Sequence, residues 1–204
     1  MKKQEQNALA FLVRHVPAFI SPNMLTAIGL AGSFVVLASF ILASWANSCF
    51  LLLGIAGFAI HWLGDSLDGR IAYYRNSPRK WYGTSLDVSV DWISVICIGL
   101  GYMFYANGGW KLGGFVFVVL YGWSMLLAQL RYKVTNRYSI DSGLFGPTEV
   151  RIILSLMLVC EVVIPRSIHY VSSLCCAILL IVNVLDFFKL LKIADLKDKA
   201  EKGI

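Results

Sequence analysis

Four aspartates are spaced so that they can act together as one chemical site. Asp65 and Asp68 lie three residues apart and Asp87 and Asp91 four apart, so on helices each pair projects from one face. A short segment rich in Arg, Lys and Pro, residues 75–82, joins the pairs, and a helical hairpin would bring all four carboxylates to one level. Oxygen ligands without His or Cys favour a hard divalent cation, Mg²⁺ or Mn²⁺. Two such ions would balance the four charges and suit displacement at phosphorus, with one carboxylate also available as general base.

Small residues accompany these carboxylates. Gly69 directly follows Asp68, Ala72 lies about one turn further on, and Gly83 lies four residues before Asp87. Bare backbone beside a carboxylate cluster allows a bulky ligand to approach closely. Two alternatives stay open at this point: tight helix packing for the small residues, and the ion or proton pathway of a transporter for the acids. His61, one turn before Asp65, is either a hydrogen-bond donor to that carboxylate or a helix-packing side chain.

The elements that must position these residues are apolar and long. Of 204 residues, 58% are hydrophobic and 15% charged, whereas a soluble domain carries about 25% charged residues and a disordered chain more. Uncharged runs of roughly 20 residues, enough to cross a bilayer, cover 24–43, 44–64, 92–110, 112–130 and 168–185. A weaker sixth run, 148–164, contains Glu149, Arg151 and Glu161. We predict an all-α integral membrane protein with six transmembrane helices in a single domain, residues 1–204.

The basic residues predict the orientation of these spans. If all six cross and the N-terminus is cytoplasmic, sixteen of the 18 Lys and Arg residues lie on the cytoplasmic side and only Lys111 and Arg166 outside. Without the weak span, the lysines of the C-terminal tail, 192–204, would lie on the wrong face. We therefore expect both termini in the cytoplasm, in the plasma membrane of a bacterium or archaeon. The net charge of +6 then indicates contact with anionic head groups rather than with nucleic acid.

The N-terminal 20 residues predict a helix outside the spans. Leu9, Leu12, Val13 and Val16 recur at helical spacing, as in an amphipathic helix on a membrane surface. Ser21-Pro22 then has the form of an N-cap followed by a proline at the first helical position, which would start the first span.

The aspartates and small residues together form a specific pattern. Asp65-x-x-Asp68-Gly69-x-x-Ala72, followed by Gly83-x-x-x-Asp87-x-x-x-Asp91, resembles the signature of the CDP-alcohol phosphotransferase family, also called CDP-alcohol phosphatidyltransferases. The resemblance implies a phospholipid-synthesis enzyme, usually a homodimer, in which an alcohol or lipid acceptor attacks a CDP-linked donor and CMP leaves. It further implies that Asp65, Asp68 and Asp87 hold the metal ions, and that Asp91 is the catalytic base and also a candidate metal ligand.

The resemblance also implies residues that bind the donor. The start of the first span, Ser21-Pro22-Asn23-x-x-Thr26, is similar to an element of the family's nucleotide pocket, which assigns Asn23 and Thr26 to substrate binding. Gly69 and Ala72 would make room for the cytidine, and Gly83 is also assigned to substrate binding. The family usually has Arg after the Ala, but this sequence has Tyr73. Either Arg70 or Arg75 would then supply the cation, or the pocket differs.

Two branches of the family differ in which substrate is the lipid. Basic residues after the fourth span suit the phosphate of a soluble acceptor, and so favour CDP-diacylglycerol as donor: Arg131, Lys133 and Arg137, with Arg151. In contrast, Gly146-Pro147-Thr148-Glu149 resembles a Gly-Pro-x-Glu of enzymes that transfer from CDP-choline or CDP-ethanolamine to diacylglycerol, which makes Glu149 a candidate acceptor-side residue. Positive-inside anchoring and an ordinary helix start explain these residues equally well, so the sequence leaves the branch open.

Overall fold

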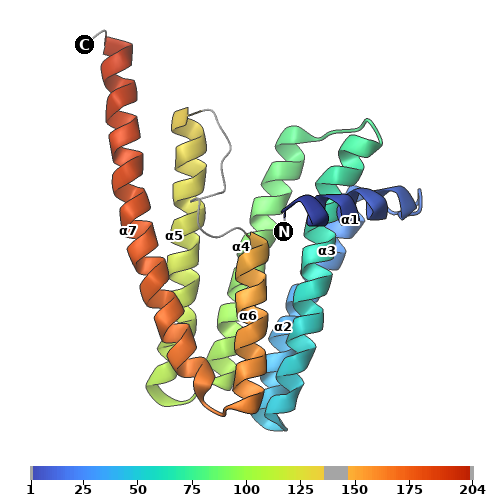
Figure 1. Cartoon of the computed structure of the whole chain (residues 1–204), viewed down its shortest axis with the longest axis vertical. Coiled ribbons are helices and arrows are strands. Elements are labelled where there is room, and N and C mark those ends of the chain that lie inside the picture. Colours follow the sequence, from blue (N-terminus) through green and yellow to red (C-terminus); the bar gives the residue numbers. More distant parts are fainter. Residues whose placement is uncertain (1, 136–146, 203–204) are drawn as a thin grey trace. The chain divides into compact units, whose positions relative to one another are not determined.

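The computed structural model describes residues 2–135 and 147–202, and within these ranges every regular element is a helix. Contacts along the chain divide it into two compact units, Met1–Tyr105 and Ala106–Ile204. The four aspartates all lie in the first unit. Figure 1 labels the helices of both units.

The first unit consists of four helices and one short 3₁₀ turn. In chain order these are α1 (Lys2–His15), α2 (Pro22–Trp45), η1 (Ser48–Leu51), α3 (Leu52–Tyr74) and α4 (Lys80–Tyr105). Helix α2 begins as the sequence predicts: the Ser21 hydroxyl accepts a hydrogen bond from the Met24 N–H at 3.2 Å, and Pro22 occupies the first turn. Because α2 packs against both α3 and α4, it is the central element of this unit.

Helices α2 and α3 touch backbone to backbone through glycines. A Cβ atom added at Gly64 would lie 2.5 Å from the Gly29 nitrogen, and one added at Gly32 would lie 2.6 Å from the Gly57 carbonyl oxygen. Atoms cannot approach so closely, so only glycine permits this separation of the two helices. The contact sets the position of α3 on α2, and with it that of Asp65, the residue after Gly64.

Both helices that carry the aspartates extend beyond the uncharged runs. Helix α3 continues to Tyr74 and α4 already begins at Lys80, so the carboxylates lie inside the helices and not at their ends. Charge does not stop a helix, because its hydrogen bonds are between backbone groups. Helix α3 ends at Tyr74, just before Asn76, where φ is 53° and the chain turns so that the Ser77 N–H bonds to the Ala72 carbonyl at 2.9 Å.

Helix α1 packs against α2 and α3. Leu9 and Val13 are buried in a cluster with Leu25 of α2 and with Leu67 and Ile71 of α3. In Figure 1, α1 runs crosswise to α3. The N-terminal helix is therefore present with an apolar face buried on the protein, while its place on a membrane surface stays a prediction.

The described part of the second unit contains one 3₁₀ turn and three helices: η2 (Gly108–Lys111), α5 (Leu112–Thr135), α6 (Pro147–Val163) and α7 (Ser167–Lys202). Helix α7 packs against both α5 and α6. A buried amide joins two of them, because the Asn183 side chain donates to the Leu120 carbonyl at 2.7 Å and accepts from the Ser124 hydroxyl at 2.5 Å.

Glu161, one of the charges that weaken the sixth run, has a local structural role. Its side chain is only 3% exposed, and its carboxylate accepts hydrogen bonds from the N–H groups of Arg166 at 3.0 Å and Ile168 at 2.8 Å. The first N–H groups of a helix have no partner within that helix. Glu161 near the end of α6 therefore satisfies the start of α7.

Within residues 2–135 and 147–202, five helical segments are long and apolar enough to cross a membrane: Pro22–Trp45, Ser48–Tyr74, Lys80–Tyr105, Gly108–Thr135 and Ser167–Lys202. Helix α6 has 17 residues, about 25 Å at 1.5 Å per residue, and is slightly too short to be counted among them. The structure thus supports an all-helical integral membrane protein. The sixth span and the cytoplasmic position of both termini stay predictions.

Candidate active site

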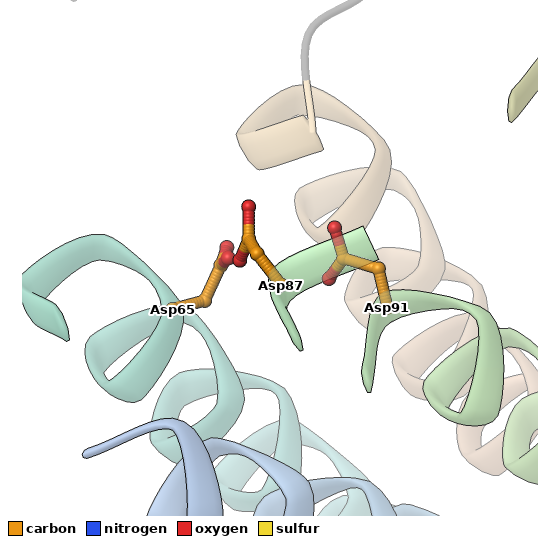
Figure 2. A group of neighbouring side chains, drawn as sticks. All are labelled: Asp65, Asp87 and Asp91. Atoms are coloured by element: carbon orange, nitrogen blue, oxygen red, sulfur yellow. The ribbon is translucent and has the colours of Figure 1, made fainter. Parts of the chain in front are cut away.

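Three carboxylates from two helices converge in the first unit. Asp65 projects from α3, and Asp87 and Asp91 project from successive turns of α4 (Figure 2). One ligand oxygen from each residue can be chosen so that all three lie within 4.8 Å of one another. Three partly buried carboxyl groups so close together repel each other when ionised, and a cation between them would relieve that repulsion. Because the donors are all carboxylate oxygens, this set fits Mg²⁺ or Mn²⁺.

Asp68 lies beside this cluster and is held from α2. Its carboxylate accepts hydrogen bonds from the Thr26 hydroxyl and from the Gly69 N–H, both at 2.5 Å. Thr26 is buried, with 7% of its surface exposed. The structure therefore brings Asp65, Asp87 and Asp91 into one cluster and places Asp68 next to it, with both of its oxygens in hydrogen bonds.

A buried polar network lies behind the cluster. The His61 Nε2 atom lies 2.9 Å from the Ser94 hydroxyl and 3.8 Å from a carboxylate oxygen of Asp91. Ser94 also accepts a hydrogen bond from the Ser33 hydroxyl at 2.8 Å. All three side chains are buried, and they come from α2, α3 and α4. His61 thus combines helix packing with a position beside Asp91.

An open pocket of about 170 Å³ adjoins the carboxylates. Its lining comes from the start of α2, the end of α3 and the first turns of α4: Pro22, Asn23, Thr26, Asp68, Gly69, Ala72, Tyr73, Arg79, Lys80, Gly83, Thr84, Leu86 and Asp87. A Cβ atom added at Gly69 or Gly83 would meet no described atom within 4 Å. Unlike Gly64, these two glycines are not needed for helix packing, so they leave room for a ligand.

The pocket lining includes two cations that the sequence patterns did not single out. Arg79 donates a hydrogen bond to the Asn23 side-chain oxygen at 2.8 Å, and its guanidinium carbon lies 4.8 Å from the centre of the Tyr82 ring. Lys80, the second cation, lies with its ammonium 5.1 Å from the Trp81 ring centre. The signal was present in the basic segment 75–82 between the two aspartate pairs, but charge alone does not say which of its three cations face a pocket.

The two arginines proposed to replace a cation at Tyr73 lie elsewhere. Arg75 donates to the backbone carbonyls of Ile20 at 2.6 Å and Pro17 at 2.9 Å, and so ties the end of α3 to the segment between α1 and α2. Arg70 is exposed. Neither is among the residues that line the pocket.

The candidate acceptor residues belong to the second unit. Arg131 of α5 forms an ion pair with Asp186 of α7 at 3.4 Å, and both side chains are mostly buried. Lys133 is exposed near the end of α5, and Glu149 lies in the first turn of α6. Arg137 falls outside the described residues.

Comparison with known proteins bears directly on the resemblance seen in the sequence. The family model for CDP-alcohol phosphatidyltransferase matches residues 19–187, a range that includes the carboxylate cluster, the pocket and most of the second unit. No individual curated protein matched the chain. The match covers far more than half of the sequence, and it confirms the family indicated by the aspartate pattern. The chain therefore belongs to the CDP-alcohol phosphatidyltransferase family.

Proposed function

We propose that this protein is a membrane enzyme that transfers a substituted phosphate group from a CDP-linked donor to an alcohol hydroxyl and releases CMP. Membership of the family implies a transferase of phosphate-containing groups that uses a CDP-alcohol. The observation that carries the proposal is the three-carboxylate cluster beside an open pocket walled by bare glycine backbone. Such a site offers oxygen ligands for a cation and space for a nucleotide in adjoining positions.

The pocket suits the cytidine diphosphate part of the donor. Gly69 and Gly83 face open space from α3 and α4, and Ala72 adds only a methyl group to the same wall. Asn23 and Arg79 supply hydrogen-bonding groups on the opposite helix and on the α3–α4 connection. A flat, polar ligand with negatively charged phosphates matches these walls.

The carboxylates suit divalent metal ions. Asp65, Asp87 and Asp91 would hold Mg²⁺ or Mn²⁺, and Asp68, fixed by Thr26, would complete a set of four charges matched to two ions. Bound there, the ions would neutralise the donor phosphates and stabilise the charge that develops during transfer.

The residues of the chain then perform the proton transfer. We assign Asp91 as general base, because its carboxylate belongs to the cluster and the buried His61 lies beside it at 3.8 Å. Asp91 accepts the proton of the acceptor hydroxyl while that oxygen forms a bond to the phosphorus distal to cytidine. The bond from this phosphorus to the bridging oxygen breaks, and CMP leaves with the electron pair. Asp91 afterwards returns its proton to water.

We propose that the reaction takes place at the cytoplasmic side of the membrane. The four basic residues at the α3–α4 end of the first unit, Arg70, Arg75, Arg79 and Lys80, and the lysines of the C-terminal tail would face the cytoplasm by the positive-inside rule. We further propose a homodimer, as is usual for the family.

A CMP-release assay tests the reaction and identifies the substrates. Purified protein in lipid nanodiscs is supplied with CDP-diacylglycerol and glycerol phosphate, inositol phosphate, inositol or serine, or with CDP-choline or CDP-ethanolamine and diacylglycerol. We expect CMP from one branch only, dependent on Mg²⁺ or Mn²⁺ and abolished by a chelator. Ion flux without CMP from any donor would instead identify a transporter and overturn the proposal.

A matched pair of variants tests the assignment of Asp91 as the general base. Asp91→Asn preserves size and removes the basic carboxylate, so it should abolish CMP release while the protein keeps its thermal unfolding midpoint. Asp198→Asn makes the same change at an exposed site in α7 and should keep full activity. Activity that survives Asp91→Asn would refute the assigned role.

A further inference from the structure

Arg79 is a cation with a defined orientation at the edge of the pocket. One of its terminal nitrogens donates to the Asn23 side-chain oxygen at 2.8 Å, and its guanidinium lies 4.8 Å from the centre of the Tyr82 ring. Asn23 in turn donates through its amide to the Tyr82 hydroxyl at 3.3 Å. The three side chains form a closed ring of contacts, which we call the Arg79 clamp.

The clamp joins three elements that share no local sequence. Asn23 belongs to the first turn of α2, Arg79 to the connection after α3, and Tyr82 to the first turn of α4. A long arginine side chain normally samples many rotamers, and fixing it costs conformational entropy. Here two contacts with neutral side chains already restrict it, so a ligand would meet a guanidinium that is largely pre-oriented.

The clamp holds Arg79 without neutralising it. The hydrogen bond and ring contact of Arg79 are with neutral side chains, and the nearby carboxylate of Asp68 attracts it electrostatically without an ion pair among the described residues. A guanidinium has five N–H donors, and its contact with Asn23 uses one of them. The same pocket contains the carboxylates of Asp68 and Asp87, so one ligand there would face both acidic side chains and a cation.

The other basic residues of this end of the unit lack this combination. Lys80 also lines the pocket, but its ammonium is associated with Trp81, a ring that is 72% exposed. Arg75 donates to backbone carbonyls of the segment between α1 and α2, and Arg70 is exposed and is not among the lining residues.

We infer that Arg79 is a substrate-binding residue that contacts the phosphates of the cytidine nucleotide, and that Asn23 and Tyr82 position it. Planar guanidinium groups bind phosphate oxygens through paired, charge-assisted hydrogen bonds, which an ammonium does not match. The inference rests on the proposed function, since it assumes that the pocket takes the CDP part of the donor. It assigns the phosphate-binding cation to the α3–α4 connection instead of to Arg70 or Arg75.

The test compares binding of CDP and of cytidine, which differ only in the phosphates. Equilibrium dissociation constants are measured with the purified full-length protein in nanodiscs with Mg²⁺. We expect Arg79→Gln to raise the Kd for CDP by about tenfold or more, the effect of losing a charge-assisted hydrogen bond, and to change the Kd for cytidine less than about twofold. Arg79→Lys should bind CDP with intermediate affinity because it keeps the charge and loses the planar fork.

Three further variants complete the design. Asn23→Ala should weaken CDP binding less than Arg79→Gln, because the cation remains but is less well held. Lys80→Gln should also weaken CDP binding less than Arg79→Gln does. Arg14→Gln removes one exposed positive charge from α1 and should leave both constants unchanged, which controls for net charge. Thermal unfolding midpoints of all variants should match the parent, since Arg79 is on the surface.

The outcomes separate this inference from the proposed reaction. Unchanged CDP binding by Arg79→Gln would overturn the inference, as would an equal loss of CDP and cytidine binding, which would indicate contact with the base, or a larger loss in Lys80→Gln. Failure of the parent protein to release CMP from any donor would overturn the proposed function. Selective loss of CDP binding would still support a phosphate-binding Arg79 in that event.

Discussion

The glycines of α3 give a prediction in which two similar substitutions have opposite effects on stability. Gly64 faces α2 in backbone contact, and Gly69, five residues later on the same helix, faces the open pocket. Replacing either with alanine adds one methyl group to the middle of a helix. The two variants therefore differ mainly in what that methyl group meets.

The expected magnitudes follow from the contacts. At Gly64 the new Cβ would lie 2.5 Å from both the Gly29 nitrogen and the Leu25 carbonyl oxygen, and 2.7 Å from the Gly29 Cα. These are backbone atoms, so α3 must move away from α2 by about 1 Å to reach ordinary van der Waals contact. Overpacking of this kind costs about 1–3 kcal/mol or more, whereas alanine gains about 1 kcal/mol over glycine in helix propensity. We expect Gly64→Ala to be destabilised and Gly69→Ala to be as stable as the parent or slightly more stable.

The consequences for activity differ as well. The displacement of α3 in Gly64→Ala would carry Asp65 away from Asp87 and Asp91, so metal dependence should shift to higher Mg²⁺ concentration. Gly69→Ala leaves the helices in place but puts a methyl group into the pocket. It should weaken CDP binding while the metal requirement stays unchanged.

Thermal unfolding in nanodiscs and CMP release over a range of Mg²⁺ and donor concentrations measure these effects. Gly83→Ala serves as a second variant with an open Cβ direction and should resemble Gly69→Ala. A Gly64→Ala variant that unfolds at the parent midpoint would contradict this prediction. So would a Gly69→Ala variant that loses as much stability as Gly64→Ala does.

Three other predictions concern single hydrogen bonds and ion pairs. Thr26→Val removes the hydroxyl that holds Asp68, so the Mg²⁺ concentration for half-maximal activity should rise about tenfold; an unchanged metal titration would contradict this. Glu161→Ala leaves two N–H groups at the start of α7 without their acceptor and should lower stability by about 2–4 kcal/mol, seen as a lower unfolding midpoint. Arg131→Met should cost about 1–3 kcal/mol by leaving Asp186 without its arginine, and the added change Asp186→Leu should recover most of that loss. If the double variant regains stability but not activity, Arg131 acts on the acceptor; if it regains both, the pair is structural.

Several features of the first unit could be predicted from the sequence because they depend on neighbouring residues. The Ser21-Pro22 helix start is a contact between residues three apart, and the structure has it at that position. The carboxylate spacing likewise depends only on helical periodicity, so Asp87 and Asp91 project together once α4 is helical. The end of α3 and the start of α4 were harder to predict from the sequence. An uncharged run indicates where the chain can cross a membrane, but it does not indicate where helical backbone hydrogen bonding stops.

The partners of the long basic side chains could not be predicted from the sequence. A basic segment of several arginines and lysines is equally compatible with a phosphate site, a membrane anchor or a backbone tie. Only the packing of α2 against α3 and α4 assigns Arg75 to the carbonyls of the α1–α2 segment and Arg79 to Asn23 and the pocket. A long side chain can reach several different partners, and the helix that packs beside it decides which partner it contacts.

The sequence alone specified the chemical groups of the candidate site: four aspartates in a family pattern, on helices whose apolar length and first caps are encoded locally. The tertiary structure decided how that chemistry is arranged. It placed Asp65, Asp87 and Asp91 in one cluster, turned Asp68 toward Thr26, and set two glycines against a pocket while others hold α2 to α3. The physical reason is that spacing along a helix is a property of the chain, whereas contact between helices depends on which surfaces can approach.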